Sequence, residues 1–154
     1  MAIRKIRIDG DSILTKTSRP VTEFDDRLFQ LLDDMKDTLY KAEGCGLAAV
    51  QVGVLRRVVV VDCGDGYIEL INPEIVSSEG EQKESEACLS VPGLSGVTLR
   101  PAQVRVRAQN RDGNWCMYQG DGLKARCFCH ELDHLDGVLF PQKLAPGEKL
   151  QRSR

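Results

Sequence analysis

The chain has 154 residues, a length typical of one domain with its own hydrophobic core. Hydrophobic residues make up 42% of the chain and charged residues 29%, which excludes a disordered or collagen-like protein. The 21 Lys and Arg nearly balance the 23 Asp and Glu, so net charge favours neither nucleic acid nor an anionic membrane as a partner. The longest apolar runs are far shorter than the roughly 20 residues that cross a bilayer, and the N-terminus lacks the apolar centre of a signal peptide. We therefore expect one domain over residues 1–154, with no membrane span and no export signal.

The first predicted element is an amphipathic helix over about residues 25–43. Its apolar residues recur at spacings of three and four, which places them on one face: Leu28, Leu31, Leu32, Met35, Leu39 and Ala42. Thr22, followed by Asp25 three residues later, marks the expected start. Gly44 stands where a residue with positive φ would end the helix.

Strands are expected through the middle of the chain. A β-branched run predicts a buried strand over residues 57–62, and a weaker strand over residues 67–71 is expected to stop before Asn72. Apolar and polar residues alternate over residues 104–109, and turn residues then lead into a strand over residues 115–118. A hairpin is therefore predicted there.

A second helix is predicted over residues 122–135, with Asp121 as its cap and Gly137 as its stop. One long helix, several antiparallel strands and a late helix indicate an α+β fold, in which the antiparallel strands surround the C-terminal helix. The polar segment over about residues 145–154 has few apolar side chains to bury and is expected to fray.

The strongest chemical signal is the sequence His130-Glu131-Leu132-Asp133-His134. Histidines four residues apart project from one helical face and can bind one divalent metal ion, while Glu131 lies near the open side of that ion. The two are the only histidines of the chain. The alternative is a chance match on a solvated helix, expected in under ~1% of chains of this length. Because a catalytic tetrahedral centre takes three protein ligands and leaves one position for water, a third ligand must come from elsewhere.

Cys88, in the segment Glu86-Ala87-Cys88-Leu89-Ser90, is the candidate third ligand. The chain has six cysteines and no export signal, which favours reduced thiols or metal ligands over disulfides. For four of the others we favour the role of a small buried hydrophobic residue: Cys63, Cys116, Cys127 and Cys129.

A third signal is the glycine- and alanine-rich stretch over residues 44–53, directly after the first helix. Small residues let another backbone approach closely, and the side-chain amide of Gln51 can donate to a developing oxyanion. By itself, the stretch is equally consistent with a tight turn between a helix and a strand.

Taken in order, residues 44–51, 86–90 and 130–134 resemble the three signature motifs of the peptide deformylases. The resemblance extends from the N-terminus to about Phe140. It implies a metal-dependent hydrolase that removes the N-formyl group from the N-terminal formylmethionine of newly made proteins and releases formate. It also implies one divalent ion, Fe(II) in the cell, although the ligand set is also compatible with Zn, Ni or Co.

The resemblance assigns the metal ligands to Cys88, His130 and His134. Metal-bound water would attack the formyl carbon, with Glu131 as general acid and base. The partners would be N-formyl-Met nascent polypeptides, with contact to the ribosome left open and no nucleic acid or membrane partner. We expect a monomer. Because no Arg- and Ser-rich targeting extension is present, we expect it in the bacterial cytoplasm.

The resemblance also implies the residues that contact the substrate. Gln51 and the backbone N–H of Leu89 would hold the oxyanion. The backbone around Cys45 and Gly46 would pair with the substrate in the manner of a β-strand.

Two residues depart from the family pattern. Ala87 replaces the usual glycine before the cysteine ligand, and its methyl group is expected to shift that ligand or to require a backbone angle open to alanine. Arg126 stands where an apolar residue often lines the pocket for the methionine side chain, and we expect its guanidinium to reach Glu84 or solvent. Asp133 is expected outside the ligand set, and Arg100 is a weak candidate for peptide binding.

Two alternatives remain at this point. One keeps the metal site but changes the substrate to another N-formyl compound or small amide. The other is a structural metal module in which Cys127 or Cys129 supplies a fourth ligand. Against the structural module, only three ligands are apparent and Glu131 is left over, whereas structural zinc is normally four-coordinate and closed.

Overall fold

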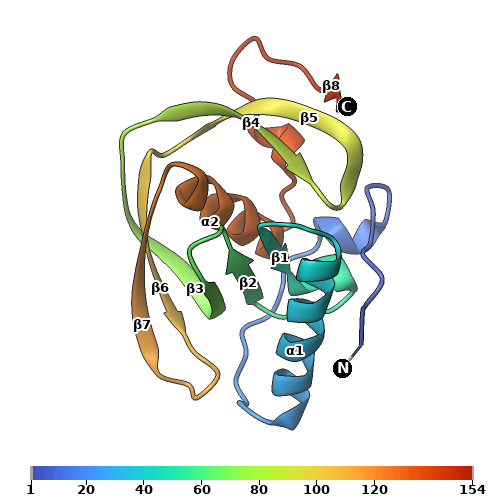
Figure 1. Cartoon of the computed structure of the whole chain (residues 1–154), viewed down its shortest axis with the longest axis vertical. Coiled ribbons are helices and arrows are strands. Elements are labelled where there is room, and N and C mark those ends of the chain that lie inside the picture. The colour runs from blue at the N-terminus through green and yellow to red at the C-terminus, as the bar shows by residue number, and fades with distance from the viewer. Residues whose placement is uncertain (1, 154) are drawn as a thin grey trace.

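A computed structural model describes residues 2–153 and shows a mixed α/β fold of two α-helices and antiparallel sheets (Figure 1). One sheet has the strand order β1-β2-β3-β6-β7 and the other the order β4-β5-β8. The helices are α1 (Asp26–Lys41) and α2 (Gly122–Leu135). The strands are β1 (Gly46–Ala48), β2 (Val58–Asp62), β3 (Tyr67–Glu79), β4 (Gln82–Cys88), β5 (Val91–Arg100), β6 (Gln103–Gln109), β7 (Trp115–Asp121) and β8 (Gln151–Arg152). Among the described residues, no helix is both long and apolar enough to cross a membrane.

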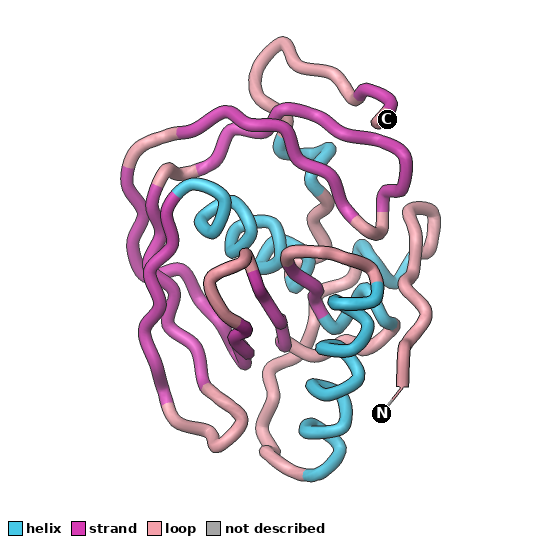
Figure 2. Tube along the Cα trace, viewed as in Figure 1, coloured by secondary structure: helices cyan, strands magenta, loops and turns pink. Residues whose placement is uncertain are grey.

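The helix α2 lies at the centre of the molecule. It contacts β1, β2, β6 and β7 of the larger sheet and β5 of the smaller one. Figure 2 shows the long strands as a curved wall around this helix. The predicted bounds of this helix are confirmed, and Asp121 occupies its N-cap position without a side-chain capping bond.

The strand β2 is buried on both faces, which explains its run of valines. Val59 and Val61 belong to the hydrophobic cluster that includes α2 residues, whereas Val58 and Val60 belong to the cluster built around α1. Since successive side chains of a strand point to opposite faces, this one strand joins both clusters. The two helices are thereby fixed on opposite faces of the larger sheet.

The ends of α1 differ from the predicted ones. Asp25, and not Thr22, is the N-cap, and its side chain accepts a hydrogen bond from the Leu28 N–H at 3.1 Å. At the other end Glu43 has a φ of 57°, so it adopts the left-handed conformation expected of Gly44. A Cβ on Gly44 would lie 3.0 Å from Leu89 Cδ1, the end of a flexible side chain.

The strand β3 continues through Asn72, where the sequence predicts an end. The register shifts between Ile71 and Glu74, so Asn72 and Pro73 lie in a β-bulge. Proline has no backbone N–H, and in a bulge it is not required to donate a hydrogen bond to the neighbouring strand. Asn72 takes a φ of 52°, and its side chain bonds the backbone N–H of Val21 at 2.8 Å and its carbonyl at 2.9 Å.

Two further differences concern the smaller sheet. The predicted hairpin is confirmed as β6 and β7, but β4 and β5 have no counterpart among the predicted strands because β4 is largely polar and exposed. The C-terminal segment was expected to fray, yet Gln151 and Arg152 pair with Ser95 and Leu94. These exposed residues are ordered by backbone hydrogen bonds to β5. Such bonds leave no pattern of apolar residues in the sequence.

Candidate metal centre and adjoining pocket

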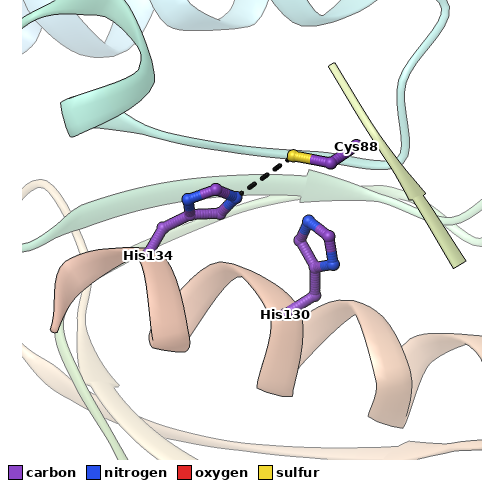
Figure 3. A group of neighbouring side chains, drawn as sticks. All are labelled: Cys88, His130 and His134. Carbon is purple, nitrogen blue, oxygen red and sulfur yellow. Dashed lines mark hydrogen bonds between the residues drawn. The ribbon is translucent and has the colours of Figure 1, made fainter. Parts of the chain in front are cut away.

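Cys88, His130 and His134 come together between the two sheets (Figure 3). Their ligand atoms all lie within 4.8 Å of one another, and Cys88 Sγ is 3.3 Å from His134 Nε2. All three residues are buried. A thiol and two imidazoles in this arrangement form a donor set suited to a divalent transition metal.

Two elements bring these ligands together. The histidines project from the same side of α2, while Cys88 is the last residue of β4, at a register shift that starts the tight turn into β5. In this turn the Ser90 N–H donates to Cys88 Sγ at 3.4 Å, and Gln51 Nε2 donates at 3.7 Å. Both donors hold the sulfur in place beside the histidines.

Glu86 fixes the orientation of His130. Its Oε1 lies 2.9 Å from His130 Nδ1, and its two oxygens accept hydrogen bonds from Arg100 at 2.9 and 3.0 Å and a further one from the Thr98 hydroxyl. Burial opposes the charge of this carboxylate, but the bonds from His130 and Arg100 outweigh burial and lower its pKa to about 2. A charged Glu86 holds the imidazole proton on Nδ1 and leaves Nε2 free to bind a metal. The sequence reading missed this role, although Glu86 lies in the same motif as Cys88.

Arg100 is not available to bind a peptide, so this expectation was wrong. Only 4% of the residue is exposed, and besides Glu86 it donates to Asp133 Oδ2 at 2.6 Å. Asp133 therefore holds Arg100 and is not part of the cluster of Cys88, His130 and His134. The four residues His130, Glu86, Arg100 and Asp133 form one continuous hydrogen-bonded chain.

Glu131 is buried beside the three candidate ligands with a free carboxylate oxygen. Its Oε1 has no hydrogen-bond partner among the described residues. Burial raises the pKa of Glu131 to about 7, and the negative charge of Glu86 adds to the rise. Burial likewise lowers the pKa of His134 to about 3, which keeps its imidazole neutral. A carboxyl group with a pKa near 7 can both accept and donate a proton at neutral pH.

A cavity of about 350 Å³ opens beside these residues, between β1, β4 and α2. Residues from all three predicted motifs line it, among them Cys45, Gly46, Gln51, Leu89 and Glu131. The pocket thus gathers segments that are far apart in the sequence.

Gln51 has a fixed orientation at one wall of this pocket. Its Oε1 accepts a hydrogen bond from the Ala48 N–H at 2.9 Å, so its Nε2 points toward Ser90 Oγ at 3.0 Å. The amide therefore presents N–H donors toward Cys88, where an oxyanion donor would be needed.

The backbone of β1 offers an open edge beside the pocket, because β1 is the terminal strand of its sheet. The Cys45 carbonyl accepts from the Asp62 N–H at 2.8 Å and is thus not available to a substrate. Hydrogen bonds alternate along an antiparallel pair, so the N–H and carbonyl of Gly46 point away from β2. Of the two residues expected to pair with a substrate, Gly46 retains the free backbone groups.

The two departures from the family pattern are accommodated. Ala87 lies in extended β4 opposite Ser95 with its methyl group exposed, and the cysteine that follows it remains next to the histidines. Arg126 was expected to reach Glu84 or solvent. It is partly exposed and donates to Gln82 Oε1 and to the Ser85 carbonyl, both at 3.1 Å, rather than to Glu84. The arginine therefore joins α2 to β4 at the rim of the pocket.

Comparison with known proteins identifies relatives of this fold and site. The family model for polypeptide deformylase matches residues 3–150. A peptide deformylase of Acetivibrio thermocellus is 58% identical over 144 residues, which cover 94% of this chain and 85% of the relative. A crystal structure of a peptide deformylase from Legionella pneumophila superposes with a TM-score of 0.90 at 46% identity, covering 94% of this chain and 87% of that one. The deformylase of Ehrlichia chaffeensis in complex with actinonin gives a TM-score of 0.91 at 36% identity, covering 95% of this chain and 91% of that one. With its motifs gathered in one pocket and these relatives across nearly its whole length, the chain belongs to the peptide deformylase family.

Proposed function

We propose that Cys88, His130 and His134 hold the single divalent ion with which this deformylase hydrolyses N-formyl-Met peptides. The observation that carries this proposal is the proximity of one buried thiol and two buried imidazoles, with ligand atoms within 4.8 Å of one another. The tautomer of His130 set by Glu86 and the neutral imidazole of His134 both suit metal binding. We propose Fe(II) as the ion in the cell, since one thiol and two imidazoles are compatible with it.

Glu131 is the proposed general acid and base. When bound, the ion supplies a Lewis acid that activates water and polarises the formyl carbonyl. Glu131 Oε1 is free to accept a proton from the attacking water and to return it to the departing amine nitrogen. Its buried position keeps bulk water from competing for that proton.

Gln51 and Leu89 are the proposed oxyanion donors. Gln51 is oriented by Ala48 before any substrate arrives, so its Nε2 already lies on the side of Cys88 and Ser90. Leu89 follows Cys88 directly and lines the same cavity, which places its backbone N–H close to the candidate metal ligand.

The substrate is proposed to bind as an additional strand. β1 and β4 are each the terminal strand of a sheet, and both border the cavity. A peptide between them would use the free backbone groups of Gly46 and direct its first side chain into the cavity. We place this reaction on nascent polypeptides, carried out by a monomer in the bacterial cytoplasm.

Formate release from formyl-Met-Ala-Ser tests the proposal. The parent protein, loaded with Fe(II) without oxygen, is compared with Glu131→Gln at matched metal content. We expect turnover to fall by roughly 10²–10⁴-fold in the variant, because one proton-transfer group is lost. Metal content and actinonin binding should remain close to the parental values. Turnover within threefold of the parent would contradict the role of Glu131, and metal retained after Cys88→Ala would contradict the ligand set.

A further inference from the structure

Arg126 lies at the rim of the pocket in a fixed orientation and without an acidic partner. Its Nε donates to Gln82 Oε1 and its Nη1 to the Ser85 carbonyl, both at 3.1 Å. Gln82 is itself held, because its Nε2 donates to the carbonyls of Pro101 and Gly122 at 2.9 Å each. Within residues 2–153, no carboxylate forms an ion pair with Arg126, and its Nη2 has no hydrogen-bond partner. This nitrogen is therefore available to an anionic group of a bound ligand.

The Ser85 carbonyl lies on the open edge of β4. Ser85 is paired with Val97 of β5, but the Val97 carbonyl accepts from the Ala145 N–H at 2.9 Å and so faces away from β4. Ser85 and Val97 thus form a non-hydrogen-bonded pair, in which the backbone groups of each residue point away from the other strand. Ala87, two residues further on, presents its backbone groups to the same open edge. Since Arg126 already binds the Ser85 carbonyl, Ala87 is the residue left to pair with a peptide.

The two open edges define the direction of the proposed substrate strand. The formyl group at the start of the peptide must reach the cluster that contains Cys88, which is the last residue of β4. The rest of the peptide therefore runs back along β4 toward Ser85, with Ala87 on one side and Gly46 of β1 on the other.

The alternation of side chains along an extended peptide places its third residue near Arg126. With the first side chain in the cavity, the second faces solvent beside the exposed methyl group of Ala87, and the third returns to the face of the first. Each extended residue advances the chain by about 3.3 Å, so the third side chain lies about 7 Å beyond the first, in the direction of Ser85. The guanidinium that binds the Ser85 carbonyl lines this part of the cavity.

We propose that Arg126 makes this deformylase selective for peptides with an acidic residue, Asp or Glu, at the third position. The inference rests on the proposed binding of the substrate as an added strand. A carboxylate on the third side chain can accept a charge-assisted hydrogen bond from Nη2 of Arg126. Leu123, which is exposed and lies one helical turn earlier on α2, offers an apolar surface for the stem of that side chain. Glu43 also lines the cavity, but it is exposed and precedes β1 on the other wall, so water screens its charge.

Kinetics on formylated tetrapeptide amides test this selectivity. The series is formyl-Met-Ala-Glu-Ala-amide and its counterparts with Gln or Lys at the third position, and the amide removes the competing terminal carboxylate. At low ionic strength we expect kcat/KM for the Glu peptide to exceed that for the Lys peptide by roughly 3–10-fold, with Gln between them. The difference should lie mainly in KM, because Arg126 binds a part of the substrate that does not react, and it should shrink at high salt.

Three variants make the assignment specific. Arg126→Gln should bring the ratio for the Glu and Lys peptides to within about twofold of one, and Arg126→Glu should reverse it. Lys124→Gln is the matched control, because it removes a positive charge from the same helix at a residue that pairs with Asp65 and does not line the cavity. The control should retain the parental ratio.

Calorimetry with the unformylated product peptides makes the same comparison through Kd, without turnover. Equal constants for the Glu and Lys peptides, a parental ratio in Arg126→Gln, or an equal preference for Glu at the second position would overturn the proposal. Absence of formate release from every peptide would instead refute the proposed function. In that case the Kd values still decide whether Arg126 favours an acidic third residue.

Discussion

Gly46 is the residue at which the pocket has the least room. A Cβ there would meet Glu131 Cγ at 2.7 Å and Cys127 Sγ at 2.8 Å. We expect Gly46→Ala to cost about 1–3 kcal/mol of folding free energy, because a buried helix face must move. Turnover should fall by roughly tenfold or more, since Glu131 is displaced from the reacting atoms. Urea unfolding and formate release measure the two effects.

Gly44→Ala is the matched control for that substitution. The nearest atoms to a Cβ at Gly44 are the ends of flexible leucine side chains, at 3.0 Å in Leu89 and 3.2 Å in Leu39. These can give way, so the control should lose much less activity and stability. Equal effects of the two substitutions would show that the contact between Gly46 and Glu131 is not the cause.

Glu86 determines how firmly His130 is held. In Glu86→Gln, Arg100 keeps only Asp133 as a charged partner, and the proton on His130 Nδ1 loses its carboxylate acceptor. We expect metal affinity to fall by roughly 10–100-fold, as for other residues that orient a histidine ligand. Stability should fall by about 3 kcal/mol or more, since a buried arginine is left partly uncompensated.

Competition with a fluorescent chelator measures that affinity, and thermal unfolding measures the stability. Glu84→Gln is the control, because Glu84 lies two residues earlier on the same strand with an exposed side chain. Parental metal affinity in the Glu86 variant would contradict the positioning role.

Among the elements, α1 holds the N-terminal segment through one buried carboxylate. Asp34 accepts hydrogen bonds from the Ala2 N–H at 3.0 Å, from Arg4 Nε at 2.9 Å and from Gln30 Nε2 at 2.7 Å. Burial disfavours the charged form, but these bonds outweigh burial and lower the pKa of Asp34. The folded pKa is therefore below the unfolded value of about 3.9.

This shift predicts a pH-dependent contribution to stability. A carboxylate with a lowered folded pKa stabilises the protein above its unfolded pKa, and this stabilisation is lost as pH falls through the folded pKa. Asp34→Asn should lose about 1–3 kcal/mol at pH 7, and the difference from the parent should shrink below about pH 4. Urea unfolding at both pH values measures this. Asp37→Asn, the same substitution elsewhere on this helix, is the control.

The elements also show which sequence patterns are reliable. The bounds of α2 could be predicted because the helical spacing of its apolar residues and the residues at its two ends indicate the same start and stop. The strand β4 was missed because it is polar, exposed and at the end of a sheet, so its conformation depends on backbone bonds to β5. The bulge at Asn72 likewise depends on partners in Val21 and Gln109 that lie far away in the sequence.

For the molecule as a whole, the proposed ion would join the two sheets. Cys88 belongs to β4 of the smaller sheet, whereas both histidines lie on α2, which packs mainly on the larger one. An ion that binds only the native state stabilises that state, by about 2.7 kcal/mol when the free metal concentration is 100 times the Kd. Removal of the metal should thus lower Tm by roughly 5–10 °C. Calorimetry of loaded and chelator-treated protein measures this shift.

Cys88→Ala provides the control for metal removal. This variant should unfold at the same temperature with or without the chelator, because a ligand is missing. A parent protein whose Tm does not respond to metal would contradict the proposal that the ion joins the sheets.

The sequence alone predicted the two helices, the central hairpin and the residues of the proposed metal site. The spacing of His130 and His134 is set within one helix, so local geometry was enough to place them on the same face. The signature segments around Gln51 and Cys88 identified the family, but not the contacts that hold these residues in place.

Only the tertiary structure decided which residues make the contacts around the site. Arg100 was a candidate for substrate binding, yet the fold buries it between Glu86 and Asp133, where an arginine requires charged partners. This outcome depends on residues distant in the chain, which the packing of α2 between the sheets brings together and which no local pattern predicts.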